Sequence, residues 1–288
     1  MKRIKIYSVL LLLLCSNLTY SQIGSKRMKK IYDDFMSREL LVVTEPTEKS
    51  MKKLKANPKL YEEFLKNKDN EHLWLKEAMD KYWTVNKPSY LSRDAAKKMM
   101  KDNSEKYALM QIQLITQQYT HNFTGFYDTY TYTSLTFDFP KVGTTRLFGY
   151  LPDGSYISKA RYFAGIRFLN DQYSNKITLP TKEGKDAVKK GTLLLNKNFL
   201  SKKLTPELIK EYYPYNIKIV DQKKIDDAIL NEEDVFYIFK NPVYGMKENF
   251  KAHMIINAKT GKMHGITSLQ EGLEINKKVL KKYTEILE

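Results

Sequence analysis

The only cysteine of this 288-residue chain, Cys15, lies in an N-terminal segment that has the parts of a secretory signal peptide. A basic start is followed by an apolar run from Val9 to Leu14 and by small residues that suit a cleavage site ending at Ser21. Cleavage there would remove Cys15 and leave no thiol. We therefore expect a fold held by its hydrophobic core, with no disulfide, cysteine nucleophile or cysteine-bound zinc.

The same segment predicts where the protein works. Residues 1–22 are interpreted as the signal peptide, so the mature protein is expected to be periplasmic or extracellular. The apolar run is too short to span a bilayer, and we expect no transmembrane helix in the mature chain. Lipid anchoring at Cys15 is the alternative. Leu14 disfavours it, because lipid-modifying peptidases prefer a small residue just before the cysteine.

The chain is strongly basic, with 49 lysines and arginines against 33 acidic residues and a formal net charge of +16. Without the three basic residues of the signal peptide the charge is 46 minus 33, or +13. Such a charge is typical of proteins that bind nucleic acid or anionic membranes. However, only seven of the basic residues are arginines, which base and phosphate recognition favours, and like charges form no long run. We therefore expect a solvated, lysine-rich surface and no nucleic-acid partner.

Apolar periodicity predicts a mixed α/β (α+β) fold in which strands and helices alternate in two series. The first series comprises a strand at 40–43, helices at 60–65 and 75–83, an edge strand at 88–91, a helix capped by Ser92 and a strand at 107–115. The second comprises a strand at 192–195, a helix opened by Thr205-Pro206, a strand at 217–220, a helix capped by Asp221 and a strand at 235–239. Each series ends in a hairpin, at 147–157 and 252–266, and amphipathic helices are expected at both ends of the chain, at 28–36 and 275–286.

The two series predict two related units with mixed sheets, each a βαβαβ arrangement followed by a hairpin. A shift of 130 residues superposes the two patterns and places Tyr82 on Tyr212, although the identities alone would not establish a duplication. The first unit is expected to span 23–180, with an aromatic insertion at about 119–139, and the second 185–288. The boundary falls near 175–190, where apolar periodicity is interrupted.

The aromatic insertion is the best candidate for a binding surface. Exposed aromatic side chains on a strand can stack on sugar rings or anchor a partner protein. Alternation along the strand assigns Leu135, Phe137 and Phe139 to the core. The candidate binding residues are then Phe123, Phe126, Tyr127, Tyr130 and Tyr132. Alternatively, these aromatic residues close over the edge of the sheet.

His253 and His264 are the candidate metal ligands. If the hairpin turns at Ala258 to Gly261, His253 pairs with Ile266 and the two imidazoles are diagonal neighbours on one face. They could form half of a zinc or copper site, and solvated surface histidines are the alternative. Motifs for nucleophilic catalysis and phosphate binding are missing from the sequence, so we assign no catalytic residue and expect no cofactor.

One run of the second unit resembles envelope-associated bacterial domains. The segments YNIKIVDQKKIDDAIL, DVFYIF and HMIINAKTGKMHGI are similar to the domain of the curli-secretion lipoprotein and to the amino-terminal part of the periplasmic Tol translocation protein. In those domains a strand ending in "VD" enters a helix, and a later hairpin turns on "D-A-x-T-G". Asn257 stands here in place of the usual aspartate. The element order also looks like that of a thioredoxin-type domain, which without cysteine would have no dithiol activity.

Together these features predict an exported, non-catalytic binding or assembly protein of the cell envelope or extracellular space. Its partner would be an envelope protein or a glycan, and its oligomeric state is open. One alternative is an extracellular hydrolase that uses carboxylates or a histidine-bound metal, since two acids placed by the fold suffice for glycoside hydrolysis. The other is a redox-inactive thioredoxin-like protein.

Overall fold

The structure is a computed structural model that describes residues 33–45, 48–120, 127–138, 147–149, 158–175, 180–244, 249–269 and 274–288. The expected signal peptide, Cys15 and most of the expected helix at 28–36 lie outside these residues, although 33–36 is helical. The helices are α2 (Glu48–Lys55), α3 (Pro58–Tyr82), α4 (Arg93–Asp102), α5 (Lys159–Ser174), α6 (Lys182–Lys190), α7 (Pro206–Tyr212), α8 (Gln222–Leu230) and α9 (Lys277–Leu287). The strands are β1 (Glu39–Glu45), β2 (Pro88–Ser92), β3 (Tyr107–Thr120), β4 (Tyr127–Asp138), β5 (Leu147–Gly149), β6 (Leu193–Asn196), β7 (Ile217–Val220), β8 (Phe236–Tyr244), β9 (Asn249–Asn257) and β10 (Met263–Leu269).

The strands form two mixed sheets of the same topology, as the sequence predicts. The first sheet has the order β2-β1-β3-β4-β5 and the second the order β7-β6-β8-β9-β10. In each sheet the first strand of the unit pairs in parallel with the two strands that follow the crossovers. The last three strands are antiparallel neighbours. Strand for strand, the second unit therefore repeats the first.

The repeat is maintained with a small drift in register. Tyr82 and Tyr212, the last residues of α3 and α7, lie 130 positions apart, as the predicted shift requires. The caps of α4 and α8, Ser92 and Asp221, lie 129 positions apart (221 minus 92). One residue fewer in the second unit between the helix and the next strand accounts for the change. The aromatic segment is an integral strand, β4, which is the counterpart of β9 rather than an addition to the unit.

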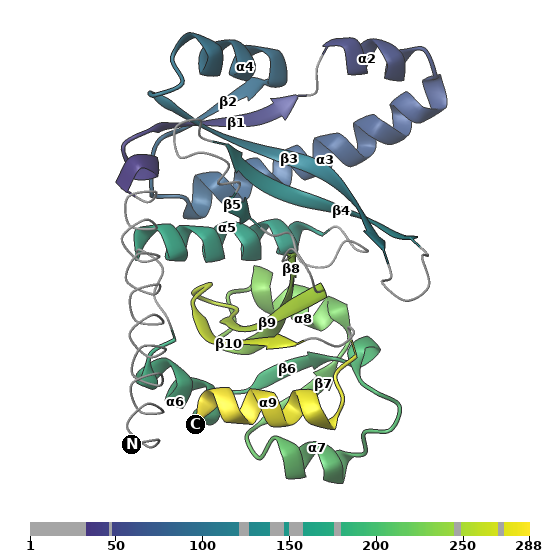
Figure 1. Cartoon of the computed structure of the whole chain (residues 1–288), viewed down its shortest axis with the longest axis vertical. Coiled ribbons are helices and arrows are strands. Elements are labelled where there is room, and N and C mark those ends of the chain that lie inside the picture. The colour runs from purple at the N-terminus through teal and green to yellow at the C-terminus, as the bar shows by residue number, and fades with distance from the viewer. Residues whose placement is uncertain are drawn as a thin grey trace, which may run out of the picture.

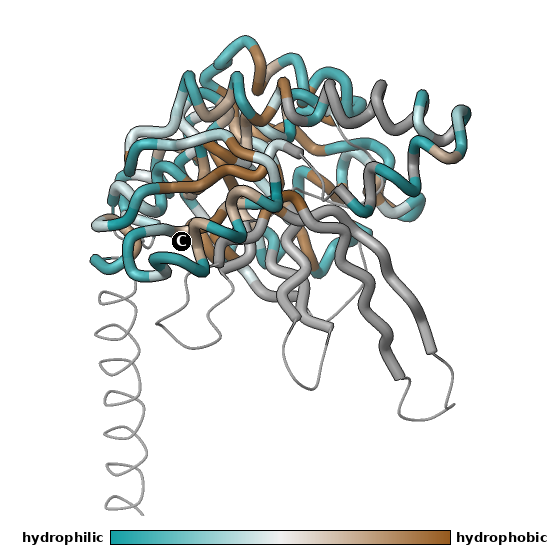
Figure 2. Tube along the Cα trace, turned by 90° about the horizontal axis from the view of Figure 1, so that it is seen from above, coloured by the Kyte–Doolittle hydropathy of each residue, from teal (hydrophilic) through white to brown (hydrophobic). Residues whose placement is uncertain are grey.

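The units stack in layers (Figure 1). Helix α4 covers the outer face of the first sheet through a small cluster that includes Leu41, Ala96 and Leu109. Helices α3, α5 and α8 lie between the two sheets in the main core. Helices α6, α7 and α9 cover the far face of the second sheet. Hydropathy follows this order, with apolar segments inside and hydrophilic ones at the surface (Figure 2).

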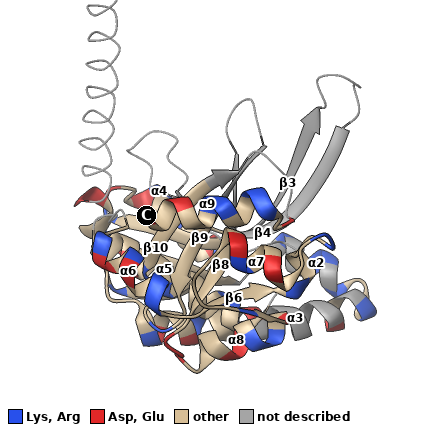
Figure 3. Cartoon of the chain, turned by 90° about the horizontal axis from the view of Figure 1, so that it is seen from below, with Lys and Arg blue, Asp and Glu red and all other residues tan. Residues whose placement is uncertain are grey.

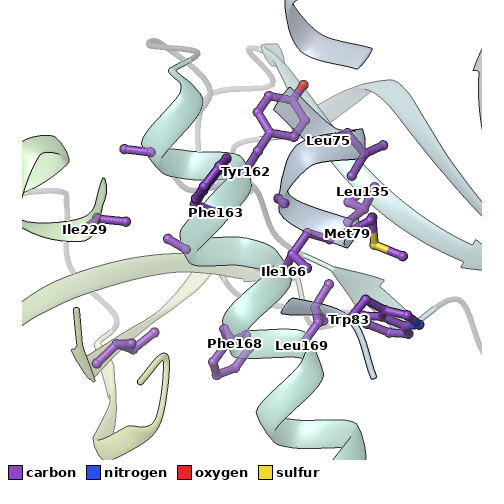
Figure 4. Close-up of a cluster of buried hydrophobic side chains, with 14 of the residues drawn as sticks. Leu75, Met79, Trp83, Leu135, Tyr162, Phe163, Ile166, Phe168, Leu169 and Ile229 are labelled. Atoms are coloured by element: carbon purple, nitrogen blue, oxygen red, sulfur yellow. The ribbon is translucent and has the colours of Figure 1, made fainter. Parts of the chain in front are cut away.

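Helix α5 is the centre of the main core. Its residues from Ala160 to Leu169 are all buried. On one side Tyr162, Ile166 and Leu169 face side chains of α3, and on the other Phe163 and Phe168 face the second unit, where Ile229 of α8 lies (Figure 4). The apolar side chains of α5 lie on both sides of the helix, so both sides have to be covered. The apolar surface of α5 therefore joins the two units.

Helix α9 occupies the corresponding place at the end of the second unit but has one polar face. Val279, Leu280, Tyr283 and Leu287 are buried against the sheet. The outward residues are charged and exposed, and charges of both signs lie along this helix (Figure 3). They are Lys277, Lys278, Lys281, Lys282 and Glu285. A terminal repeat with a polar outer face ends a stack of repeats.

Several local predictions are confirmed. Ser92, Thr205 and Asp221 each accept a hydrogen bond from the backbone at the start of the predicted helix. The turn after β9 has Gly261 at φ +72°, the left-handed conformation that glycine favours. Asn257 Oδ1 accepts hydrogen bonds from the backbone of Lys259 (3.0 Å) and Thr260 (2.9 Å), so asparagine supplies the acceptor of this turn.

Other predictions need correction. The two helices expected between 60 and 83 are one continuous helix, α3. The segment 175–190, where the boundary between the units was predicted, contains α6, whose cap is Thr181. Of the hairpin expected at 147–157, the structure describes only β5, which pairs with β4.

None of the helices in the described ranges combines the length and the apolar character that a membrane crossing requires.

Candidate functional site

Among the described strands, the antiparallel pair of β3 and β4 has the longest paired segment. Their register runs without a break from Leu109 opposite Asp138 to Thr120 opposite Tyr127. Strand β1 pairs with β3 only from Tyr107 to Met110, and β5 pairs with β4 only from Leu135 to Phe137. Residues 113–120 and 127–134 therefore pair only with each other among the described strands. We call these two segments the β3–β4 ribbon.

The ribbon carries most of the aromatic residues that the sequence singles out. In the register Tyr127 lies opposite Thr120, Tyr130 opposite Gln117 and Tyr132 opposite Ile115. Phe123 and Phe126 lie outside the described residues, in the connection between the strands. Leu135, which the strand alternation assigned to the core, is 1% exposed and belongs to the main core.

The two hairpin histidines differ in register from the prediction. His253 lies opposite Thr267, because a β-bulge between Met263 and Gly265 shifts the pairing by one residue. The bulge places His264 outside the regular ladder. The prediction assumed an unbroken two-residue period through the hairpin, so one extra residue changed every pair beyond it.

His253 is a core residue and not a surface one. Its side chain is 0% exposed, and its Nδ1 lies 2.6 Å from the hydroxyl of Tyr283 on α9. Burial raises the pKa of Tyr283 well above its usual value, so that hydroxyl stays protonated. The imidazole thus serves as a buried hydrogen-bonding partner that helps to fix α9 on the second sheet.

His264 is partly buried between α6 and β8. Its ring meets the ring of Phe236 edge-on at 5.3 Å, and its Nδ1 lies 2.6 Å from the position that a Cβ on Gly184 would occupy. Burial lowers the pKa of His264, with the charge of Lys262 adding to the effect, while Gly184, Asp171 and Asp234 act in the opposite direction. The ring is therefore neutral near pH 7.

A small cavity with a mainly apolar lining lies at the carboxyl end of β6, where ligands commonly bind in open α/β sheets. It has a volume of about 40 Å³ and is lined partly by Arg161 of the first unit and Asn196, Gln222 and Asp226 of the second. Asn196 donates to Gln222 (2.7 Å), which in turn donates to Asp226 (2.7 Å). Its size suits about three water molecules rather than an organic substrate.

The metal-ligand prediction remains untested. In the part of the chain that the structure describes, no three residues of the types His, Cys, Asp and Glu come together as a metal-binding group. His253 and His264 have separate surroundings, one against α9 and the other against α6.

Comparison with known proteins identifies no relative: no protein-family model, curated sequence or solved structure matches this chain.

Proposed function

We propose that this protein is an exported, non-catalytic binding or assembly protein of the cell envelope or extracellular space, and that it binds through the β3–β4 ribbon. The observation that supports this most directly is the length of the ribbon, which continues for eight residue pairs beyond its last neighbouring strand. At about 3.4 Å per residue this is roughly 25 Å of paired backbone. An isolated two-stranded segment is marginally stable in water, so a ribbon of this length benefits from a partner.

The composition of the ribbon also supports a binding role. Tyr130 and Tyr132 alternate with threonines on β4, and tyrosine offers a large contact area with few rotatable bonds. Two buried polar side chains outside the ribbon have structural partners: Tyr283 for His253, and the backbone of the second unit for Arg167. The partner would be an envelope protein or a glycan.

Binding to envelope extract tests the proposal. The full chain and a Tyr130→Ala/Tyr132→Ala variant are immobilised and compared for the amount of each captured component. We expect the variant to lose about 2 kcal/mol or more of binding free energy, or roughly thirty-fold in affinity, as for tyrosines at the centre of an interface.

A Leu73→Ala/Ile219→Ala variant is the matched control, because both residues are exposed, apolar and outside the ribbon. It should capture the same components as the unchanged chain. Full capture by the double tyrosine variant would refute the binding role of the ribbon.

Export needs a separate measurement. Mass spectrometry of the protein recovered from the medium and from the envelope should find a chain that starts just after Ser21 and lacks Cys15. A chain that retains an acylated Cys15 would make it an anchored protein, and one that retains residues 1–22 unmodified in the cytoplasm would refute export.

A further inference from the structure

The edges of the two sheets are protected against pairing with other strands, except along the ribbon. Natural proteins protect edges with short strands, proline, lysine, β-bulges or a covering helix. Among the described edges, β2 begins with Pro88, β5 has three residues, and β7 has four residues with Lys218 among them. Strand β10 contains the bulge at His264 and is covered by α6 and α9.

The counterpart of the ribbon in the second unit carries the same kind of protection. Strand β8 contains Lys240 and Pro242, and β9 contains Lys251. Pro242 has no N–H to donate, and proline within a sheet is confined to edges and bulges. The same topological position is thus protected in one unit and unprotected in the other.

The ribbon stands out most clearly by its charge. Lysine and arginine make up 49 of 288 residues, or about one in six, yet none occurs between Lys106 and Lys141. The only charged residues in that stretch are Asp128 and Asp138, both on β4. The free edge of β3 from Gln113 to Thr120 therefore contains no charged residue at all.

From these observations we infer that the free edge of β3, residues 113–120, pairs with the same edge of a second copy of this chain. Two strands that use one edge around a two-fold axis pair antiparallel, with the axis passing through the segment. The ribbons of the two copies would then form a continuous four-stranded sheet. This inference rests on the proposed function and names the protein's own copy as a partner in assembly.

Charge favours a second copy over other partners. Two molecules with a net charge near +13 to +16 repel each other over most of their surfaces, and the neutral β3 edge lets them approach without opposing lysines. An acidic partner would gain nothing from an uncharged edge. It would bind the lysine-rich helices instead.

Disulfide scanning tests the geometry. In a Cys15→Ser background the chain has no other cysteine, so single cysteines can be placed in turn at positions 113–120. A cysteine on the two-fold axis lies opposite its equivalent in the second copy. A cysteine one residue away from the axis is offset from its equivalent by two residues along the strands, about 7 Å, which exceeds the reach of a disulfide. We expect covalent dimers to peak sharply at one or two adjacent positions. Ile219→Cys, exposed on the β7 edge, is the control and should give only background cross-linking.

Equal cross-linking at all eight positions would overturn the two-fold antiparallel arrangement, and so would the formation of long polymers. A wild-type chain that sediments as a monomer at every concentration tested would overturn the inference altogether.

A charge variant provides the second measurement. Thr116→Lys/Gln117→Lys places lysines near the middle of the edge, where like charges from the two copies oppose each other. We expect dimerisation to weaken at least about ten-fold in sedimentation experiments. Ile219→Lys, the matched control on β7, should leave it unchanged, and unchanged circular dichroism and melting temperature show that both variants fold. Unaltered dimerisation of the β3 variant would refute the inference.

The two proposals fail in distinguishable ways. If the chain is monomeric but Tyr130→Ala/Tyr132→Ala abolishes capture from envelope extract, the copy-to-copy pairing is wrong and the binding role of the ribbon stands. If the chain dimerises through β3 but the tyrosine variant captures all components, the copy-to-copy pairing stands and the capture of envelope components through the ribbon tyrosines is wrong.

Discussion

The guanidinium of Arg167 lies over the ring of Tyr82, 4.3 Å from its centroid, and donates to the tyrosine hydroxyl at 2.7 Å. The same guanidinium donates to the backbone carbonyls of Ile229 (2.8 Å) and Ala258 in the second unit. Arg167 is 4% exposed. One arginine on α5 therefore connects α3, α8 and the β9–β10 turn.

Replacing Arg167 by alanine should destabilise the whole chain. The change leaves the two carbonyls without these donors and removes the stacking on Tyr82, and we expect a loss of about 3 kcal/mol or more of unfolding free energy. Arg167→Lys should retain less than half of this unfolding free energy, because an ammonium group cannot donate in the several fixed directions of the guanidinium. Urea unfolding provides the measurement.

Lys81→Ala is the control for this effect. Lys81 is 51% exposed at its side chain and contacts Glu232, which also accepts from Tyr82. An exposed ion pair contributes at most about 1 kcal/mol. Equal losses for the Lys81 and Arg167 variants would contradict the role of the buried guanidinium.

Gly261→Ala should also be strongly destabilising. Gly261 has φ +72°, and a Cβ there would lie 2.6 Å from Cβ of Arg167 and 2.8 Å from its carbonyl carbon. Since backbone atoms cannot move aside cheaply, we expect a cost of about 2 kcal/mol or more in chemical denaturation. Gly261→Asn, which tolerates a positive φ but has the same Cβ, should cost nearly as much. A mild effect of asparagine alone would show that strain, rather than contact with Arg167, dominates.

His264 should make the protein less stable in mild acid. Because burial lowers its pKa below the usual 6.5, the unfolded chain binds this proton more strongly than the folded one. The contribution of neutral His264 to the unfolding free energy is thus complete above pH 6.5 and is lost as the pH falls from 6.5 towards the lowered pKa. His264→Gln should show a smaller loss of unfolding free energy over that window. An identical pH dependence in urea titrations of both proteins would contradict the assignment.

Removing the hydroxyl that contacts His253 should weaken the second unit. Tyr283→Phe deletes one partner of a hydrogen bond between fully buried groups, and we expect a loss of about 1–3 kcal/mol. Tyr90→Phe is the matched control, since it deletes a hydroxyl bonded to exposed Asp80 at 2.8 Å. Its effect on the melting temperature should be much smaller. Equal melting temperatures for the two variants would contradict the prediction.

Local chemistry made much of this fold predictable. Caps such as Ser92 and Asp221, the Thr205-Pro206 helix start and Gly261 act through neighbouring residues, so their signals are complete in the sequence. The repeated order of strands and helices followed from them. The candidate site was predictable as a segment rich in tyrosine and threonine, but not as the ribbon it forms, because the pairing depends on where β1 and β5 stop.

Features that depend on tertiary packing were missed. Helix α5 has no polar face, so the periodicity that reveals surface helices is weak in its sequence. The available signal was a stretch from Ala160 to Leu169 in which Arg161 and Arg167 are the only charged residues. At the bulge, His264 packs against α6 and Phe236, which lie far away in the sequence.

The place of α5 also constrains how the chain can mature. Part of the apolar surface of this helix packs against elements of the second unit, such as α8 and β8, which follow Leu193 in the chain. During synthesis the first unit emerges before these elements exist, so the side of α5 that faces α3 can pack while the side that faces the second unit stays uncovered. Until the second unit is synthesised, the first unit therefore exposes apolar surface and is prone to aggregation. We expect a truncated chain that stops before β6 to be bound by chaperones or degraded by proteases rather than to fold as a smaller protein.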